Sequence, residues 1–530
     1  MTQPLPAVVC PQQATIGSDV TTESAPSPRT ASVVLVLAIV GLIGAVRLLL
    51  WYWPGSFFHN PASGTWTALA WDFAHGEFYR PVLSPLGFGG TRYMPVMFML
   101  HGALIWWHLD PITAGVLLMQ GSVLSVAIAL YVALRAAGVR PVLALSFAAT
   151  PWASVTYQKF ATDMRVDYLS ATFVLLAIAA VCVAMKDSRS RWLWSAGAAC
   201  VLATFSKATE IVFVVPIAFA LAAGKTRERA IWFAGLTLAM CVCVFGALEW
   251  ASAGHLLDNL RATFTDGMHV ADLWHRGLPT FLFQLVGDPL IGAMFLLAAW
   301  ALVVAVWSRT WSAIDSYFLT TTAITAVIFA SPGTSSNHMI ELQIATALAV
   351  AVAVERGRLP DRLVASVCGV LVVVLIALVL PLPWMPSPIR TLQRLGPHQR
   401  ATVEEIREEF LPPAGSYLSL DPILPVLLHQ RPSVLDPFSL NLLVVNDTAA
   451  GSNLRALVHA RSFGTIVLDD DEGVFARDMQ SGANWDERAA SRFLAAATPL
   501  VRLIASDYAI CAVRRPFVIL RPRDTACVRT

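Results

Sequence analysis

The chain has 530 residues, of which 56% are hydrophobic and 14% are charged, and its formal net charge at pH 7 is +2. This composition excludes an ordinary soluble protein, and the lack of a basic stripe or finger motif excludes a nucleic-acid-binding protein. Apolar runs of about 20 residues recur along the chain, and a helix of that length can cross the hydrocarbon core of a bilayer. We therefore expect a mainly α fold, a polytopic membrane helix bundle.

The first 30 residues are rich in Ser, Thr and Pro. They lack the basic segment, short apolar core and cleavage site that together make a signal peptide. We expect residues 1–30 to be a disordered cytoplasmic tail.

The apolar runs predict about eleven spans within a transmembrane bundle, residues 31–382. The expected spans are 31–53, 112–134, 142–158, 168–185, 193–206, 209–223, 231–250, 287–307, 314–331, 338–354 and 363–382. Their basic ends fall on one side, which is typical of the cytoplasmic side of a membrane. This pattern predicts a multi-pass membrane protein with its N-terminus in the cytoplasm. The run 94–107 is too short to span, so we expect a juxtamembrane or re-entrant helix there.

The first outer loop, residues 54–93, is too polar to lie in lipid, yet it is rich in aromatic side chains. A loop of this length between spans is usually functional or disordered, and its aromatic content argues against disorder. We interpret it as the reaction-side loop of a membrane enzyme.

The last part of the chain, residues 385–530, has shorter apolar runs that alternate with helical patterns, which predicts a small α/β domain. It follows a last span that leads outward, so we expect it to be extracytoplasmic. The expected strands are 417–420, 465–468 and 517–520, and the expected helices are 402–410, 453–461 and 487–497. The acidic run 469–472 is either a solvated loop end or a cation site. Cys511 and Cys527 can form a disulfide if this end faces an oxidising compartment.

Two carboxylates of the first outer loop are candidate catalytic residues. Residues 68–77 read as a short helix whose apolar side can lie on the membrane surface, with Asp72 projecting from it. A carboxylate at Asp72 or Glu77 can act as general base on an acceptor hydroxyl or hold a divalent cation. The alternative is a solvated carboxylate on an interfacial helix.

Further candidates lie at the outer ends of the expected spans, where ionisable groups near lipid suggest function. Arg92 and Tyr93 follow two glycines, and the Arg92 guanidinium can bind a phosphate with two hydrogen bonds or reach a lipid headgroup. Arg165 and Asp167 stand where a short loop enters the membrane, and their mutual pairing is the alternative to a role in binding.

Lys207 lies with Glu210 at another outer turn, where it is either a phosphate contact or an anchor for the turn. His338 and Glu341 are three residues apart and share one helix face. They follow Asn337, and together they suit hydrogen bonding to a sugar or between helices. No set of these residues predicts a metal site.

The sequence resembles the GT-C glycosyltransferases, specifically the bacterial proteins related to protein O-mannosyltransferases and aminoarabinose transferases (family 39-like). The likeness covers residues 31–382 and implies a bacterial inner (plasma) membrane protein with its C-terminal domain in the periplasm. It rests on the long first outer loop, Tyr-Met-Pro at 93–95, Arg-x-Asp at 165–167, Ser-Lys-x-Thr at 206–209, and Ser-Asn-His-Met-Ile-Glu-Leu at 336–342.

The resemblance implies transfer of a sugar from a polyprenyl-phosphate-linked donor to a hydroxyl of a glycan, lipid or protein on the outer face, with inversion. Asp72 or Glu77 would activate the acceptor, and Arg92 and Lys207 would neutralise the lipid phosphate. His338 and Glu341 would orient the sugar. No cofactor is implied for certain, and a divalent cation would be optional.

The sequence departs from the family at the start of the first-loop helix. Family members carry an acidic residue there, whereas this chain has Asn60-Pro61-Ala62-Ser63-Gly64. Either Asp72 or Glu77 takes over the role, or the activity is altered or lost. The alternatives are therefore a non-catalytic membrane scaffold of a cell-envelope glycan system or a transporter. A transporter would typically show paired halves with broken helices near the midplane, which this sequence does not.

Overall fold

The structure is a computed structural model of the chain. It describes residues 61–161, 163–187, 191–223, 227–263, 270–331, 334–379, 399–411, 416–446, 448–469, 498–514, 517–525 and 527, with scattered residues between 32 and 46. The expected tail 1–30, the acidic residues 470–472 and the expected helix 487–497 lie outside the described residues, as does most of the first expected span.

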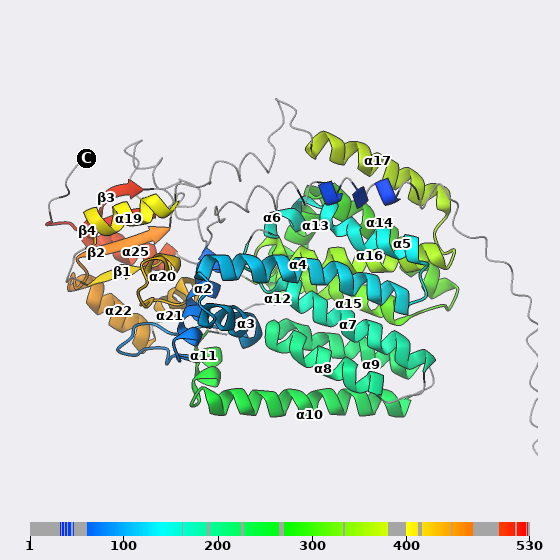
Figure 1. Cartoon of the computed structure of the whole chain (residues 1–530), viewed down its shortest axis with the longest axis horizontal. Coiled ribbons are helices and arrows are strands. Elements are labelled where there is room, and N and C mark those ends of the chain that lie inside the picture. Colours follow the sequence, from blue (N-terminus) through cyan, green and yellow to red (C-terminus); the bar gives the residue numbers. More distant parts are fainter. Residues whose placement is uncertain are drawn as a thin grey trace, which may run out of the picture.

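Apolar helices run side by side along the long axis of the molecule and form the bundle (Figure 1). The α-helices of this part are α2 (Pro61–Ala74), α3 (Pro95–Trp106), α4 (Pro111–Ala136), α5 (Pro141–Ala149), α6 (Val155–Phe160), α7 (Asp167–Lys186), α8 (Arg191–Ser206), α9 (Val214–Ala223), α10 (Arg227–Ala251), α11 (His255–Thr263), α12 (Val270–Asp272), α13 (Leu278–Gly287), α14 (Pro289–Trp307), α15 (Ala313–Ile328), α16 (Met339–Glu355) and α17 (Asp361–Val379). The described residues of the bundle also include the 3-10 helices η1 (Thr150–Ala153), η2 (Ala208–Phe213) and η4 (Ser336–His338) and the π-helix η3 (Leu273–Gly277). In α16 every side chain from Met339 to Val354 is buried, so α16 is the central helix.

Five described helices are long and apolar enough to cross a membrane. They are Pro111–Ala136, Asp167–Lys186, Arg227–Ala251, Pro289–Trp307 and Ser336–Glu355. Shorter apolar helices occupy Pro95–Trp106, Pro141–Ala153, Ala208–Ala222 and Ala313–Ile328. The prediction of a multi-pass helical membrane protein is therefore confirmed, whereas the number eleven stays a prediction.

The expected span 142–158 is wrong as a single helix. The structure breaks it into α5, η1 and α6. The break has a local cause, because Pro151 lacks the N–H that a continuing helix needs. Ser154 then starts a new helix by accepting a hydrogen bond from the Tyr157 N–H at 3.0 Å.

Exposed tryptophans mark the two ends of α10. Trp232 is 40% exposed and Trp250 is 85% exposed. They are eighteen residues apart, which corresponds to about 27 Å along a helix. That length is close to the thickness of a hydrocarbon core, about 30 Å, and tryptophan prefers the two interfaces of a bilayer. The bundle therefore has the height that a membrane requires.

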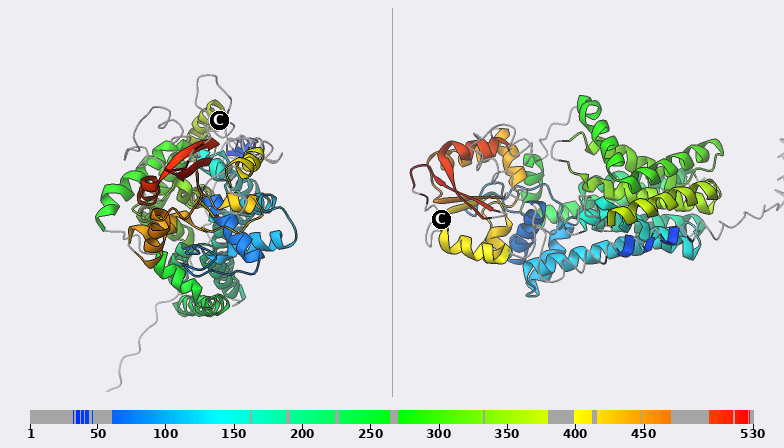
Figure 2. Two further views of the ribbon diagram at one scale, coloured as in Figure 1. Left: turned by 90° about the vertical axis from the view of Figure 1, so that its left-hand side faces the viewer. Right: turned by 90° about the horizontal axis from the view of Figure 1, so that it is seen from above.

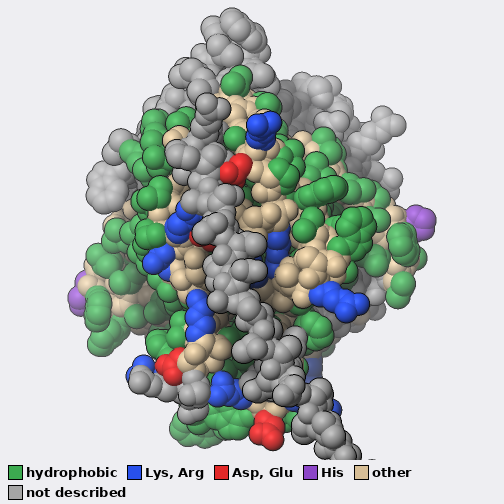
Figure 3. Space-filling view, turned by 90° about the vertical axis from the view of Figure 1, so that its right-hand side faces the viewer, with side chains coloured by type: hydrophobic (Ala, Val, Ile, Leu, Met, Phe, Trp, Pro, Cys, Tyr) green, Lys and Arg blue, Asp and Glu red, His purple; other side chains and the backbone are tan. Residues whose placement is uncertain are grey.

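Cationic side chains gather at the end of the bundle that lies away from the C-terminal domain (Figure 3). The helix ends and turns there carry Arg135, Arg140, Lys186, Arg229 and Arg309. We call this the basic end.

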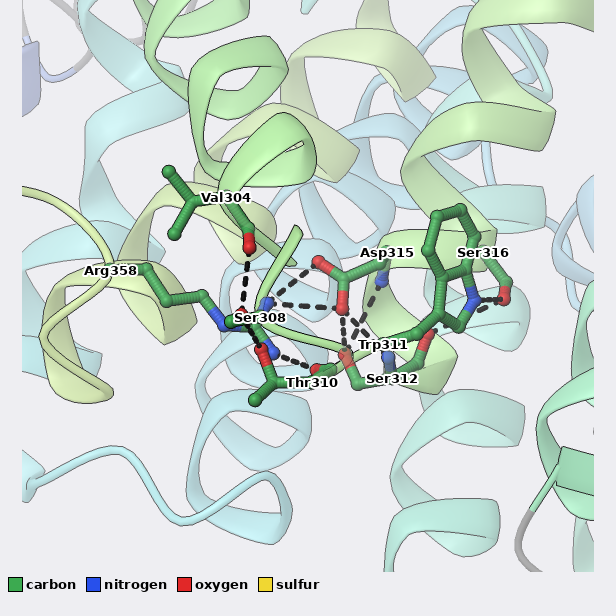
Figure 4. Close-up of polar contacts among 8 residues, drawn as sticks. All are labelled: Val304, Ser308, Thr310, Trp311, Ser312, Asp315, Ser316 and Arg358. Carbon is green, nitrogen blue, oxygen red and sulfur yellow. Dashed lines mark hydrogen bonds and ion pairs between the residues drawn. The ribbon is translucent and has the colours of Figure 1, made fainter. Parts of the chain in front are cut away.

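One arginine at the basic end is buried and ties the turn after α14 to the segment before α17 (Figure 4). The Arg358 guanidinium donates to both carboxylate oxygens of Asp315, at 3.0 and 3.1 Å, and to the Thr310 carbonyl. Asp315 in turn accepts from the Ser312 N–H and hydroxyl, which caps α15. This charge pair is buried, with side-chain exposures of 6% and 7%.

Replacing Arg358 with Ala is expected to destabilise the bundle strongly. The substitution leaves the Asp315 carboxylate buried without its cation, and breaking such a pair costs about 3–5 kcal/mol. Thermal unfolding of the purified protein measures this, with Arg309→Ala as the control because Arg309 is an exposed cation of the same turn. Equal melting temperatures for the two variants would contradict the prediction.

The described residues of the C-terminal domain, which lie between 399 and 527 with gaps, form a small mixed sheet with helices around it. Its helices are α19 (Gln399–Glu409), α20 (Ile423–Leu427), α21 (Pro437–Val445), α22 (Ala449–His459) and α25 (Thr498–Asp507), and its strands are β1 (Tyr417–Ser419), β2 (Thr465–Asp469), β3 (Tyr508–Arg514) and β4 (Phe517–Pro522). The strand order is β1-β2-β4-β3, with β1 parallel to β2 and the other two pairs antiparallel. The predicted α/β character is confirmed, and Cys511 forms a disulfide with Cys527.

The C-terminal domain sits on one end of the bundle, over the first loop (Figures 1 and 2). Phe88 of the loop pairs with Val434 in a parallel bridge. The Phe88 N–H donates to the Ser433 carbonyl at 2.7 Å, and the Leu435 N–H donates back to Phe88 at 3.1 Å. Gly87 makes this approach possible, because its φ is +107° and a Cβ there would lie 2.1 Å from the Ser433 carbonyl oxygen.

Candidate active site

Asp167 is the centre of a buried polar cluster at the end of the bundle that faces the C-terminal domain. It is the first residue of α7, and the partial positive charge of a helix N-terminus stabilises a carboxylate at this position. Its Oδ1 accepts from the Lys207 ammonium at 3.0 Å, and its Oδ2 accepts from the Asn337 side chain at 2.9 Å. One carboxylate thus joins α7, the turn after α8 and the start of α16.

Lys207 bridges two acids. It lies in extended backbone between α8 and η2, and its ammonium is 3.4 Å from Glu210 as well as 3.0 Å from Asp167. The side chain of Lys207 is 13% exposed and that of Glu210 is fully buried. Glu210 also interacts electrostatically with Glu341, which lies in the first turn of α16.

Two more predicted residues, Arg165 and His338, border this cluster. Arg165 pairs with Asp163 at 3.1 Å and Asp167 pairs with Lys207 at 3.0 Å, so the alternative of a direct Arg165–Asp167 ion pair does not occur among the described residues. His338 precedes Glu341 by one helical turn and interacts electrostatically with Lys207, Asp167, Arg165 and Arg92. Its Nδ1 is buried without a hydrogen-bond partner among the described residues.

Arg92 and Tyr93 bring the first loop to the same place. Tyr93 packs against Trp66 with ring centroids 4.5 Å apart, and its carbonyl accepts from the Tyr79 hydroxyl at 2.7 Å. Burial, with Asp436 nearby, raises the pKa of the Tyr93 phenol to about 12, so it stays a neutral hydrogen-bonding group.

The C-terminal domain contributes to the cluster through the segment that begins α21. The Arg92 guanidinium lies over the Phe438 ring, 4.3 Å from its centroid. Asp436 caps α21 by accepting from the Phe438 N–H at 3.1 Å and the Ser439 N–H at 3.2 Å, and it also accepts from the Ser439 hydroxyl at 2.6 Å. Burial raises the pKa of the Asp436 carboxyl.

Asp72 and Glu77 pair with arginines rather than with this cluster. The Arg80 guanidinium is 2.5 Å from Asp72, and both side chains are almost fully buried. Arg431 of the C-terminal domain is 3.3 Å from Glu77 and 3.9 Å from Asp72. Seven predicted residues, Arg92, Tyr93, Arg165, Asp167, Lys207, His338 and Glu341, therefore come together, and the two predicted catalytic carboxylates hold the C-terminal domain instead.

Asp72 makes a contribution to stability that depends on pH. Burial raises the pKa of its carboxyl from 3.8 to about 6, although Arg80 acts in the opposite direction. Because this folded-state pKa is raised, the contribution is complete below about pH 4 and is lost as the pH rises through 6. The melting temperature of the protein minus that of Asp72→Asn should therefore increase between pH 7 and pH 4. A constant difference would contradict this prediction.

No group of three or more His, Cys, Asp or Glu side chains in the described ranges is arranged to hold a metal ion. A cation at Asp72 would have to compete with the arginine already paired there.

Sequence reasoning missed Arg80, Arg431, Asp436 and Phe438. One feature of the sequence could have indicated Arg80, which is its position as a charged residue within the aromatic stretch of the first loop. Arg431 and the segment 436–438 gave none, because only the tertiary fold carries them to the bundle.

This chain is similar to known proteins in its structure but not in its sequence. No known protein family and no curated protein matches the sequence. The structure is similar to that of ArnT from Cupriavidus metallidurans bound to undecaprenyl phosphate, with 13% identity over 91% of this chain and 97% of that one and a TM-score of 0.51. It is also similar to the oligosaccharyltransferase AglB from Archaeoglobus fulgidus in complex with an inhibitory peptide and a dolichol-phosphate, with 12% identity over 94% and 75% of the chains and a TM-score of 0.51.

A second structure of the Archaeoglobus fulgidus oligosaccharyltransferase, tethered to an acceptor peptide, gives 12% identity over 91% of this chain and 72% of that one, with a TM-score of 0.50. These similarities extend over the bundle and most of the C-terminal domain. At such low identity they establish the architecture, which agrees with the resemblance found in the sequence. This chain has the GT-C fold of membrane glycosyltransferases.

Proposed function

We propose that this protein transfers a sugar from a polyprenyl-phosphate-linked donor to a hydroxyl acceptor at the membrane surface beneath the C-terminal domain. The observation that carries the proposal is the cluster around Asp167. Within a GT-C fold, it gathers the cations Arg92, Arg165 and Lys207 beside buried acids and a histidine at one end of the bundle. The neighbours bound to undecaprenyl phosphate and to dolichol-phosphate support the choice of lipid.

The cations suit the lipid phosphate. A prenyl phosphodiester gains a negative charge when its bond to the sugar breaks, and Lys207 with Arg92 stabilises that charge. Asn337, His338 and Glu341 present hydrogen-bonding groups to the sugar. A direct displacement at the anomeric carbon inverts its configuration.

The role of general base, predicted for Asp72 or Glu77, requires that the carboxylate first leave its arginine. The ion pairs support a different role for both residues, which is to position the C-terminal domain over Arg92. The proposed reaction does not require a metal, because phosphate is a good leaving group. A divalent cation bound at the phosphate would further stabilise its negative charge.

The basic end supports an orientation in the membrane. Arginine and lysine gather at the cytoplasmic side of membrane proteins. We propose that the basic end faces the cytoplasm of a bacterium, and that the C-terminal domain and the cluster face the periplasm.

The proposal is tested by mass spectrometry of lipid-linked sugars and surface glycans in cells with and without the protein. We expect a glycan that disappears when the protein is absent and is restored by the full chain but not by Lys207→Met. If Lys207→Met restores the glycan as well as the full chain does, the protein acts as a scaffold rather than as the transferase.

A further inference from the structure

Two buried carboxylates meet at the base of the cluster. Glu210, from η2, and Glu341, from α16, are buried, and their charges interact. Glu210 Oε1 and Oε2 and Glu341 Oε1 have no hydrogen-bond partner among the described residues. With Asp167 they make three buried acids around the ammonium of Lys207, and two ionised carboxylates side by side in a buried site repel strongly, so one of the two is expected to carry a proton. We call these two residues the carboxyl pair.

Charged and polar groups from several elements face the carboxyl pair. Lys207 faces it from the turn after α8, 3.4 Å from Glu210. Asp167 faces it from α7, and the Tyr317 hydroxyl lies near Glu341 from α15. His338 stands one turn before Glu341. The carboxyl pair, Lys207 and Asp167 thus form a continuous chain of contacts that ends at Asn337.

We propose that the carboxyl pair is the proton acceptor of the site and couples its own protonation to the charge of the lipid phosphate. This proposal rests on the proposed function. When the anomeric C–O bond to the phosphate breaks and the bond to the acceptor oxygen forms, the acceptor hydroxyl releases one proton. The prenyl phosphodiester, with one negative charge, becomes a monoester with two.

With one proton, the carboxyl pair has one negative charge, and with a second proton it has none. Taking up the released proton therefore removes a negative charge next to Lys207 at the step that adds one to the phosphate. Like charges in a buried site repel strongly, so this exchange keeps the charge of the whole site constant.

The product complex gives a test that does not depend on the sugar. Binding of undecaprenyl phosphate to the full chain in lipid nanodiscs is measured by calorimetry in two buffers of different ionisation enthalpy. The wild-type protein is expected to take up close to one more proton than Glu210→Gln or Glu341→Gln. Its Kd should rise more steeply with pH than that of the variants, by up to about tenfold per pH unit for one linked proton.

Glu355→Gln is the matched control. Glu355 ends the same helix as Glu341, but it lies at the basic end and pairs with Arg140. This variant should take up as many protons as the wild type. Because the ionisation of the ligand is the same in all four proteins, only the difference in proton uptake reports on the carboxyl pair.

Infrared spectroscopy of the unliganded protein gives a second readout. The absorption of a protonated buried carboxyl should be present at neutral pH and should be lost in both Glu→Gln variants of the carboxyl pair. Equal proton uptake in wild type and variants, with binding retained, would overturn the inference and leave the proposed function intact. A wild-type protein that does not bind undecaprenyl phosphate would overturn the proposed function, and the inference with it.

Discussion

Lys207→Met should reduce sugar transfer by about 10²–10³-fold, the usual effect of removing one group that stabilises developing charge. The structural reason is that Lys207 pairs with both Asp167, at 3.0 Å, and Glu210, at 3.4 Å. Its loss withdraws the positive charge from the lipid phosphate and leaves two buried acids facing each other. Transfer is measured with purified protein and a polyprenyl-phosphate sugar, and binding with undecaprenyl phosphate alone.

The matched control is Lys159→Met. Lys159 is an exposed lysine of α6 at the same end of the bundle, and its ammonium lies 5.3 Å from the centroid of the Phe160 ring. This variant should retain activity. If both lysine variants lose activity equally, the general charge of this end matters and the specific position of Lys207 does not.

Arg80→Met should release the C-terminal domain from the first loop. The buried guanidinium donates to the Leu86 carbonyl at 2.8 Å and to the Pro432 carbonyl at 2.7 Å while it pairs with Asp72. Its removal leaves the Asp72 carboxylate buried and two carbonyls without a donor, a loss of about 3–5 kcal/mol. Amide hydrogen exchange should increase around residues 80–90 and 431–438.

Arg431→Ala provides the control for this prediction. Its side chain is 33% exposed and its partner Glu77 is 38% exposed, so solvent screens the pair and the loss should be no more than about 1 kcal/mol. The double variant Asp72→Asn with Arg80→Met should be more stable than Arg80→Met alone, because it leaves no buried charge unpaired. A double variant no more stable than Arg80→Met would show that Arg80 acts through its carbonyl contacts only.

The sequence predicted the bundle well because the signal is local. A helix in lipid must satisfy its own backbone groups, so an apolar run of sufficient length specifies its structure with little help from the rest of the chain. The expected 168–185 and 338–354 correspond to α7 and α16 within one residue at each end. Strand β3 was missed because it follows α25 directly at Tyr508, with no glycine or proline to mark the change.

The site was predicted in part for the same reason. Polar residues at the ends of apolar runs must lie near the membrane surface, and those at the outer ends converge when the helices pack, as Asp167 and Lys207 do. The partners of Asp72 could not be predicted in this way, because Arg80 lies in the first loop and Arg431 lies in the C-terminal domain. No local sequence pattern indicates that Arg431, several hundred residues away, lies close to Asp72.

The contact between Arg80 and Pro432 joins residues 352 positions apart. Ribosomes add roughly 5–20 residues per second, so the first loop is made roughly 18–70 s before the segment that covers it. During that interval its aromatic side chains and the Arg80 charge have to remain in a state that neither aggregates nor pairs wrongly. The first loop can therefore be covered only after the segment around residue 432 has been synthesised. A chain that stops before this residue would leave the first loop uncovered.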